Sequence, residues 1–402
     1  MATSGWCSDL RCLPGTRQSY IDQIWEWVRN QEGPALCWLS GIAGAGKTCI
    51  SHEFAADLHA KLRPYSCFFF RQDNKEAAKS VIRLLAYGLS FVTGLRELIT
   101  QALQRLNDTR KVLTMTEEFT TFIVNPLQEF ASIRPLMTVV LVIDGVDDCP
   151  ADIRPKFLSA ISAGLPFLPP SVKLYFSSRP QIDIRQSFEA LRPLEIPVNV
   201  GVDLDDGDIE KYLNYELKRI SKMASLENTW PASEIEKDAR VLAPKAGGLF
   251  QCARLISSLL VNNQAQAAQP RDMVARILNF KMSSTPEVNL DTLYAEALNI
   301  ALRDVNLHPL YHQVVSTILS ASRPLVLREI WYILNVRHDD ARSVIETLIA
   351  NLETVFILRR DKDLRVMVGH PSFRDYVTSR VRCPERWYIE LPVYRIEARR
   401  TW

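Results

Sequence analysis

The stretch WLSGIAGAGKTCI, residues 38–50, places a glycine-rich turn between an apolar segment and a predicted helix. Residues 41–48 satisfy the pattern G-x-x-x-x-G-K-[ST]. Gly41, Gly44 and Gly46 permit positive φ and a close approach of the backbone to phosphate oxygens. Successive N–H groups and the start of the following helix then present partial positive charge to a phosphate. The stretch therefore predicts a nucleotide-phosphate site.

The residues of this site have different predicted roles. Lys47 adds a full positive charge near the β- and γ-phosphate oxygens, and the Thr48 hydroxyl can hold a Mg²⁺ ion. The alternative is a glycine-rich turn that enters a helix by chance, but the position between a buried strand and an amphipathic helix favours phosphate binding. The residues predicted to contact nucleotide here are Gly41, Ile42, Ala43, Gly44, Ala45, Gly46, Lys47, Thr48 and Cys49.

Short apolar segments alternate with helical patterns through the first half of the chain. The segment at 136–144 is almost continuously β-branched and apolar, as in a parallel strand that is covered on both faces. This alternation predicts an α/β fold with a doubly wound parallel sheet, preceded by an amphipathic helix. The predicted strands are 35–40, 66–70, 136–144, 173–180 and 194–200, and the entry helix is 17–30.

Charged residues follow two of these predicted strands. Asp144 ends the strand at 136–144 and is the candidate for holding Mg²⁺, while Asp147 and Asp148 are candidates for orienting the attacking water. Arg179 follows the next strand, where a cation could reach a γ-phosphate. Taken singly, these segments also fit a solvated acidic turn and an ordinary strand-ending turn. Beside a phosphate loop, we expect them to complete the site.

From residue 205 onward the pattern becomes helical. A polar break is expected at 283–289, and two helices followed by a hairpin predict a winged helix. We predict an N-terminal lead (1–16), an NTPase core (17–204), a helical subdomain (205–304), a winged helix (305–380) and a basic, aromatic tail (381–402). The tail is expected to be frayed or to form a weak basic contact surface. His52 and His59, on the helix after the glycine loop, are expected to be solvated.

Composition excludes several classes of protein. The chain has 402 residues, a formal net charge of +2 and 8 cysteines without any C-x-x-C pair. Nothing in this balance points to nucleic acid or an anionic membrane, and the cysteines indicate reduced thiols rather than disulfides or a zinc site. The N-terminus lacks a secretory pattern, and no apolar run is long enough to span a bilayer. A cytoplasmic protein is expected.

Six motifs in order resemble the NACHT NTPases, and fungal members above all. They are CLPGTR (12–17), the glycine loop (38–50), VLVIDGVDDC (140–149), FSSRP (176–180), KAGGLF (245–250) and GHPSFRDYV (369–377). The resemblance implies that Asp144 is the metal-associated aspartate, that Asp147 and Asp148 are the acidic pair, and that Arg179 is the sensor arginine. It also implies that His370 reaches the nucleotide diphosphate in the resting state. Without the resemblance, His370 would be a helix-entry or partly buried structural residue.

The resemblance also shows departures. Family members usually have Glu where this chain has Asp148, and they usually continue into sensor repeats that this sequence lacks. We expect a switch that binds ATP or GTP with Mg²⁺, rests with ADP or GDP, hydrolyses slowly and self-associates in intracellular signalling or innate-immunity-like heterokaryon or non-self recognition. The alternatives are a truncated module that regulates longer relatives by co-assembly and a small-molecule phosphotransferase. Nucleic-acid binding is not expected, because the second winged-helix helix carries Asp339, Asp340 and Glu346.

Overall fold

The structure is a computed structural model that describes residues 6–71, 75–109, 111–198, 206–223, 226, 230–262, 270–281, 283, 285–360 and 363–391. The chain divides into two compact units. The N-terminal unit comprises residues 1–42 and 47–198, and the C-terminal unit comprises residues 43–46 and 199–402. Each unit is described by itself.

A parallel five-stranded sheet with the strand order β2-β3-β4-β1-β5 forms the centre of the N-terminal unit. This confirms the predicted α/β class. Each predicted strand is present, although β3 begins three residues later than expected and β4 ends two residues earlier. The last strand is also shorter than expected, and residues 199–200 of its predicted span lie outside the described residues. The strands are β1 (Leu36–Ser40), β2 (Tyr65–Phe69), β3 (Val139–Asp144), β4 (Val172–Ser178) and β5 (Leu194–Pro197).

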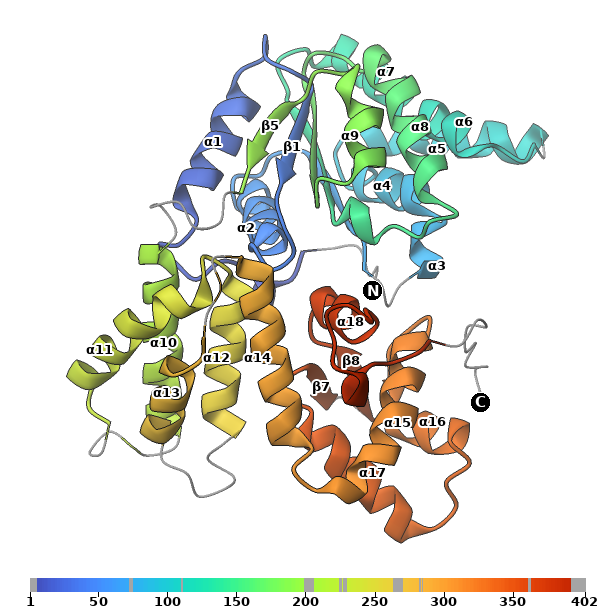
Figure 1. The fold of residues 1–402 in the computed structure, drawn as a ribbon. Helices are drawn as coiled ribbons and strands as arrows, with labels where there is room; N and C mark the ends of the chain where they lie inside the picture. Colours follow the sequence, from blue (N-terminus) through green and yellow to red (C-terminus); the bar gives the residue numbers. More distant parts are fainter. Residues whose placement is uncertain are drawn as a thin grey trace. The chain divides into compact units, whose positions relative to one another are not determined.

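Helices cover both faces of this sheet, as Figure 1 shows. Side chains alternate across a strand, so Trp38 and Phe176 face one layer while Tyr175 faces the other. The first layer belongs to a large apolar core, and Tyr175 packs against Phe54 of α2 on the opposite face. The helices are α1 (Gln18–Arg29), α2 (Lys47–Ala60), α3 (Lys75–Ala78), α4 (Val81–Leu89), α5 (Leu95–Thr109), α6 (Met115–Phe119), α7 (Asn125–Ile133), α8 (Arg154–Gly164) and α9 (Ile182–Glu189).

One local feature of this unit did not follow from the sequence pattern. A π-helical turn at Thr120–Val124 joins α6 to α7 without a break. Its residues Phe122, Ile123 and Val124 are all buried in the apolar core. The wider π turn changes the register of the helix, and apolar periodicity alone does not distinguish it from an α-helical turn.

The C-terminal unit begins with a group of packed helices. These are α10 (Asp206–Met223), α11 (Ala232–Leu242), α12 (Phe250–Asn262), α13 (Pro270–Leu278) and α14 (Pro286–Ala301). The predicted polar break at 283–289 was too long, because α14 already begins at Pro286. Proline suits the first position of a helix, where its missing N–H would have no intrahelical acceptor.

A smaller antiparallel sheet follows, with the order β6-β8-β7. It is preceded and interrupted by short helices, and this arrangement matches the predicted winged helix. The hairpin turn falls partly on residues 361–362, which lie outside the described residues. The elements are α15 (His308–Ser320), β6 (Leu325–Val326), α16 (Leu327–Ile333), α17 (Asp339–Asn351), β7 (Phe356–Arg360), β8 (Leu364–Val368) and α18 (Pro371–Val377).

The expectation of a frayed tail was wrong for residues 381–391. Trp387 is 1% exposed, its ring packs edge-on against Tyr311, and its carbonyl accepts a hydrogen bond from the Tyr311 hydroxyl at 3.1 Å. An aromatic side chain buries enough apolar area to hold a short segment in place. Tyr394 and Trp402, two further aromatic residues of the predicted tail, lie outside the described residues. Within the described part of the chain, no helix is both long and apolar enough to cross a membrane.

Candidate nucleotide-binding site

The glycine loop runs from the end of β1 to the start of α2. Gly44 and Gly46 have φ values of 83° and 92°, so the predicted need for positive φ is confirmed at these two positions. Gly41 does not share this conformation, and the prediction was wrong there. Its lack of a side chain matters for another reason, since an added Cβ would lie 3.1 Å from the Cβ of Val198.

Lys47 is the first residue of α2 and is folded over the loop that precedes it. Its Nζ donates hydrogen bonds to the carbonyl oxygens of Gly41 at 2.7 Å and Ile42 at 2.9 Å. Burial lowers the pKa of Lys47, and the carboxylates of Asp147 and Asp144 oppose that shift. The ammonium group is therefore poorly solvated and held within the loop, where an anionic ligand would compensate its charge.

Asp144 ends β3 and lies beneath the start of α2. It is 2% exposed, and its carboxylate accepts hydrogen bonds from the hydroxyls of Thr48 at 2.9 Å, Ser51 at 2.6 Å, and Ser177. Burial raises the pKa of Asp144, and the three hydroxyl donors and Lys47 oppose the rise. The structure thus joins the two residues that the sequence assigned to Mg²⁺, Thr48 and Asp144.

Ser51 and Ser177 were missed by the sequence reasoning. Ser51 lies one helical turn after Lys47 and bonds to its carbonyl, so it faces the same strand end as Thr48. Ser177 lies on β4, where Phe176 pairs with Ile143 and the next residue along β3 is Asp144. The sequence did hold a signal for each serine. Ser51 lies one helical turn from the assigned Lys47 and Thr48, and Ser177 lies on the strand next to the assigned Asp144.

Arg179 and the acidic pair meet just beyond the ends of β3 and β4. The Asp147 carboxylate accepts a hydrogen bond from the backbone N–H of Arg179 at 3.0 Å and from its Nε at 2.6 Å. The side chain of Asp148 lies further off, with 3.8 Å between its Oδ1 and the Arg179 Nη2. Asp147 therefore fixes the arginine through both of its oxygens, whereas Asp148 makes a longer ion pair.

The oxygens of Thr48 and Asp144 fit a Mg²⁺ ion. Mg²⁺ prefers hard oxygen ligands and is usually held by one or two protein groups, with phosphate oxygens and water completing its shell. A hydroxyl and a carboxylate lie together at the first turn of α2, next to Lys47. These two residues would hold the ion, which would neutralise phosphate charge.

His370 lies in the C-terminal unit, directly before α18. It is the N-cap of this helix, and its Nδ1 accepts a hydrogen bond from the backbone N–H of Ser372 at 3.2 Å. These contacts fit the alternative given by the sequence alone, in which His370 is a helix-entry residue. The residues assigned within the N-terminal unit come together, and His370 is placed by a separate set of contacts.

The expectation that His52 is solvated was wrong. It is 3% exposed, stacks face to face on Phe69 with ring centroids 3.9 Å apart, and accepts a hydrogen bond from the backbone N–H of Cys7 at 3.1 Å. The residue spacing on α2 did not reveal this, because the covering group comes from the N-terminal segment. His59 is exposed, as predicted.

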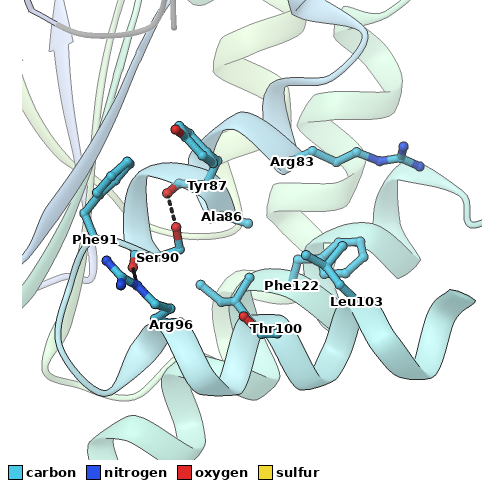
Figure 2. Close-up of a pocket in the computed structure, with 10 residues that line it drawn as sticks. Arg83, Ala86, Tyr87, Ser90, Phe91, Arg96, Thr100, Leu103 and Phe122 are labelled. Atoms are coloured by element: carbon cyan, nitrogen blue, oxygen red, sulfur yellow. Dashed lines mark hydrogen bonds between the residues drawn. The ribbon is translucent and has the colours of Figure 1, made fainter. Parts of the chain in front are cut away.

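A separate hollow of about 440 Å³ lies on the helices that flank the sheet (Figure 2). It is lined by apolar side chains such as Tyr87, Phe91 and Leu103, with Arg83 and Arg96 among its polar residues. Arg96 donates a hydrogen bond from Nε to the Ser90 carbonyl at 3.1 Å. None of the residues assigned to nucleotide lines this hollow, so it is distinct from the glycine loop.

Comparison with protein families gives a match over part of the chain. The model described as "Nephrocystin 3, N-terminal" matches residues 15–179. The matched range contains the glycine loop and the acidic residues and extends to Arg179, whereas His370 lies outside it. A comparison with curated proteins found no match.

Several solved structures are similar to this chain at low sequence identity. A Walker-type ATPase of Pyrococcus abyssi is 14% identical with a TM-score of 0.42, over 89% of this chain and 94% of that one. Cdc6p of Pyrobaculum aerophilum is 16% identical with a TM-score of 0.42, over 92% and 93% of the two chains. A Signal Transduction ATPase with Numerous Domains from Pyrococcus horikoshii, which has a tetratricopeptide repeat sensor, is 13% identical with a TM-score of 0.45, over 93% and 43%.

Proposed function

We propose that this protein is a nucleotide-dependent molecular switch with a weak, Mg²⁺-dependent NTPase activity. The observation that carries the proposal is the meeting of Lys47, Thr48 and Asp144 at the carboxyl edge of a parallel sheet. A half-buried lysine at the head of a helix, beside a hydroxyl and a carboxylate, suits a phosphate chain with its metal ion. Ligands of open α/β sheets characteristically bind at this edge.

The residues of the site have complementary parts in this proposal. The backbone N–H groups of residues 41–49 cradle the phosphates, and Lys47 turns from the carbonyls of Gly41 and Ile42 to the β- and γ-oxygens. Thr48 and Asp144 hold the metal ion. Arg179, aligned by Asp147, presents its guanidinium group to the γ-phosphate, where it senses the triphosphate and stabilises negative charge that develops during hydrolysis.

The acidic pair divides its work between its two members. Both oxygens of Asp147 bond to Arg179, which supports a positioning part for this residue. Asp148 is the better candidate for orienting water, since its side chain is 14% exposed and its ion pair to the arginine is longer. An aspartate reaches less far than the glutamate usual in the resembling family. We therefore expect slow hydrolysis that acts as a timer.

His370 and the winged helix supply the switch in this proposal. With ADP or GDP bound, the His370 imidazole donates to the diphosphate and holds a resting state. Exchange for the triphosphate releases the winged helix and exposes a surface for self-association or co-assembly with related chains. Binding energy at the phosphates shifts a two-state equilibrium, and hydrolysis resets it. A role in intracellular signalling or non-self recognition belongs to the same proposal.

The absence of nucleic-acid binding stays a prediction. On α17, the candidate groove-facing helix, Asp339 forms an ion pair with Arg342 at 2.9 Å. This pairing lowers the positive charge that the helix could offer to phosphates. A filter-binding assay with duplex DNA at low salt checks the prediction.

The test is nucleotide identification from the purified full chain. Protein is denatured, and the released nucleotide is separated and identified as ADP, ATP, GDP or GTP, with Lys47→Ala as the matched preparation. We expect close to one nucleotide per chain in the wild type and little in the variant. A wild-type protein without bound nucleotide and without affinity for ATP or GTP contradicts the proposal.

A further inference from the structure

A chain of buried polar side chains crosses the C-terminal unit and ends at His370. It consists of Gln251 on α12, Tyr294 on α14, Ser372 on α18 and the His370 imidazole; we call these residues the polar chain. The exposed fractions of Gln251, Tyr294 and Ser372 are 6%, 0% and 2%. In this unit α12 packs against α14, and α14 against α18 (Figure 1).

The direction of every bond in the polar chain can be assigned. The backbone N–H of Ser372 can only donate, so the His370 Nδ1 that it contacts at 3.2 Å accepts. The Ser372 hydroxyl, 2.6 Å from the same nitrogen, must then donate its single proton to Nδ1. It therefore accepts from the Tyr294 hydroxyl at 2.8 Å, which in turn accepts from the Gln251 Nε2 at 3.2 Å.

The polar chain determines where His370 carries its proton. A neutral imidazole has one N–H, and with Nδ1 accepting two hydrogen bonds that proton is on Nε2. We propose that Gln251, Tyr294 and Ser372 are positioning residues that hold His370 in this tautomer and orientation, so that Nε2–H serves as a donor to an anionic phosphate oxygen. The identity of that ligand rests on the nucleotide switch proposed above.

Packing around the polar chain keeps the alternative tautomer unfavourable. The Tyr294 ring lies 5.3 Å from the ring of Phe373 and 5.6 Å from that of Tyr376, both on α18. The Arg254 Nη1 donates to the carbonyl of Gly369 at 3.2 Å and so fixes the residue before His370. Moving the proton to Nδ1 would turn the Ser372 backbone N–H toward another donor, and a buried donor without an acceptor is costly.

Gln251 also contacts the tip of the glycine loop, since residues 43–46 belong to the same unit. Its backbone N–H donates to the Gly44 carbonyl at 3.2 Å, and a Cβ added at Gly44 would lie 2.8 Å from the Gln251 Cβ. One residue thus bonds to the loop through its backbone and to the polar chain through its side chain.

The tautomer can be measured directly in the wild-type chain. Histidine is labelled with ¹⁵N, and two-bond ¹H–¹⁵N correlation spectra distinguish Nε2–H from Nδ1–H for each of the 6 histidines. The signal of His370 is the one lost in His370→Gln. We expect Nε2–H for His370, and Nδ1–H in the wild type overturns the proposal without the need for any folded variant.

Substitutions then test which residues hold the tautomer. Tyr294→Phe and Ser372→Ala should shift the His370 ¹⁵N signals toward a mixture of tautomers, whereas Tyr376→Phe should leave them unchanged. Tyr376 is the matched control, because its ring stacks on Tyr294 and its hydroxyl is outside the polar chain. Unchanged His370 signals in both Tyr294→Phe and Ser372→Ala overturn the positioning role.

Release of a fluorescent ADP or GDP analogue supplies the second readout. Tyr294→Phe should speed release about 3- to 5-fold, as expected for weakening one hydrogen bond. In a His370→Gln background, Tyr294→Phe should have no further effect, because the amide donor of Gln does not depend on a tautomer. The same acceleration in both backgrounds overturns the proposal. If the tautomer results hold while His370→Ala leaves release unchanged, the proposed phosphate contact fails and the positioning role stands.

Discussion

The strand-end cluster of the N-terminal unit and the polar chain of the C-terminal unit are both buried hydrogen-bond networks, but only the first is ionic. Lys47, Asp144, Asp147 and Arg179 bring full charges into a poorly hydrated place, and burial shifts the pKa values of Lys47 and Asp144 toward their neutral forms. The polar chain uses an amide, two hydroxyls and an imidazole. In the proposed function, the charged groups would meet the charge of the ligand, whereas the neutral groups would only orient His370. Substitutions in the strand-end cluster should therefore have the larger effects.

The largest expected effect is that of Lys47→Ala on nucleotide affinity. We expect a loss of at least about 100-fold, because charge-assisted hydrogen bonds to phosphate disappear. Titration with fluorescent ATP and GTP analogues measures it. Lys173→Met is the control, since Lys173 is a buried lysine of the same unit but donates to the carbonyls of Asn30 at 2.8 Å and Gly33 at 3.2 Å. It should lower stability and spare affinity; equal losses in both variants would contradict the assignment.

Asp144→Asn should slow hydrolysis about 100-fold through weaker metal binding. It should not destabilise the chain at neutral pH. Because burial raises the pKa of Asp144 in the folded chain, its contribution to stability is full below its ordinary pKa and declines as the pH rises through the folded value. Urea unfolding across pH 4 to 8 should therefore show a flatter profile for the variant. A marked loss of stability at neutral pH would show that the hydroxyl bonds to the carboxylate outweigh the cost of its burial.

His52 allows a direct comparison with His370. Both histidines accept a hydrogen bond at Nδ1, but the His52 side chain is buried. Burial, with a smaller contribution from Arg71, lowers its pKa from 6.5 to about 4. Between these two values the unfolded chain binds a proton at His52 and the folded chain does not. The stability of the fold therefore falls as the pH drops from about 6.5 toward 4. His52→Asn keeps an acceptor for the Cys7 N–H but cannot take up this proton. Between pH 7 and pH 5 the variant should therefore lose about 2 kcal/mol less stability than the wild type. The exposed His59 gives the control variant His59→Asn, which should follow the wild type.

Substitutions in the acidic pair, Asp147 and Asp148, distinguish two roles within the strand-end cluster. Asp147→Asn should slow hydrolysis about 20-fold by loosening Arg179, with nucleotide affinity nearly unchanged. Asp148→Glu should instead raise the rate about 3-fold by extending the carboxylate toward the attacking water. Single-turnover hydrolysis separates the two. An Asp148→Glu chain that is slower than the wild type would place the water-orienting group elsewhere.

The last prediction concerns the C-terminal unit. His370→Ala should speed release of a bound diphosphate about 10-fold, which corresponds to one hydrogen bond to an anion. Stopped-flow displacement of a fluorescent ADP or GDP analogue measures the rate, and His312→Ala, on α15 of the same unit, is the control. An unchanged rate would remove His370 from the resting state and leave the switch without its proposed contact.

Sequence reasoning reached the N-terminal cluster because its geometry is local or set by sheet topology. Residues 41–48 are contiguous, and the ends of parallel strands necessarily meet at one edge, which brings Asp144 near Thr48 and Arg179 near Asp147. It missed Ser51 and Ser177, whose hydroxyls gain importance only beside a buried carboxylate. It also assigned His52 to solvent, since a helical pattern does not show that the N-terminal segment covers that position.

By itself, the sequence determined the α/β class and the glycine-rich turn that leads into a helix, and it predicted the order of the helical and winged-helix parts. These follow from hydrophobic periodicity and from residue types that a short stretch of backbone requires. Only the tertiary structure decided which carboxylate is fixed on Arg179, that Trp387 anchors the segment after α18, and that Gln251, Tyr294 and Ser372 line up behind His370. The physical reason is that burial and hydrogen-bond direction depend on groups far apart in the chain. The free energies of these hydrogen bonds and buried contacts are set only when packing excludes water.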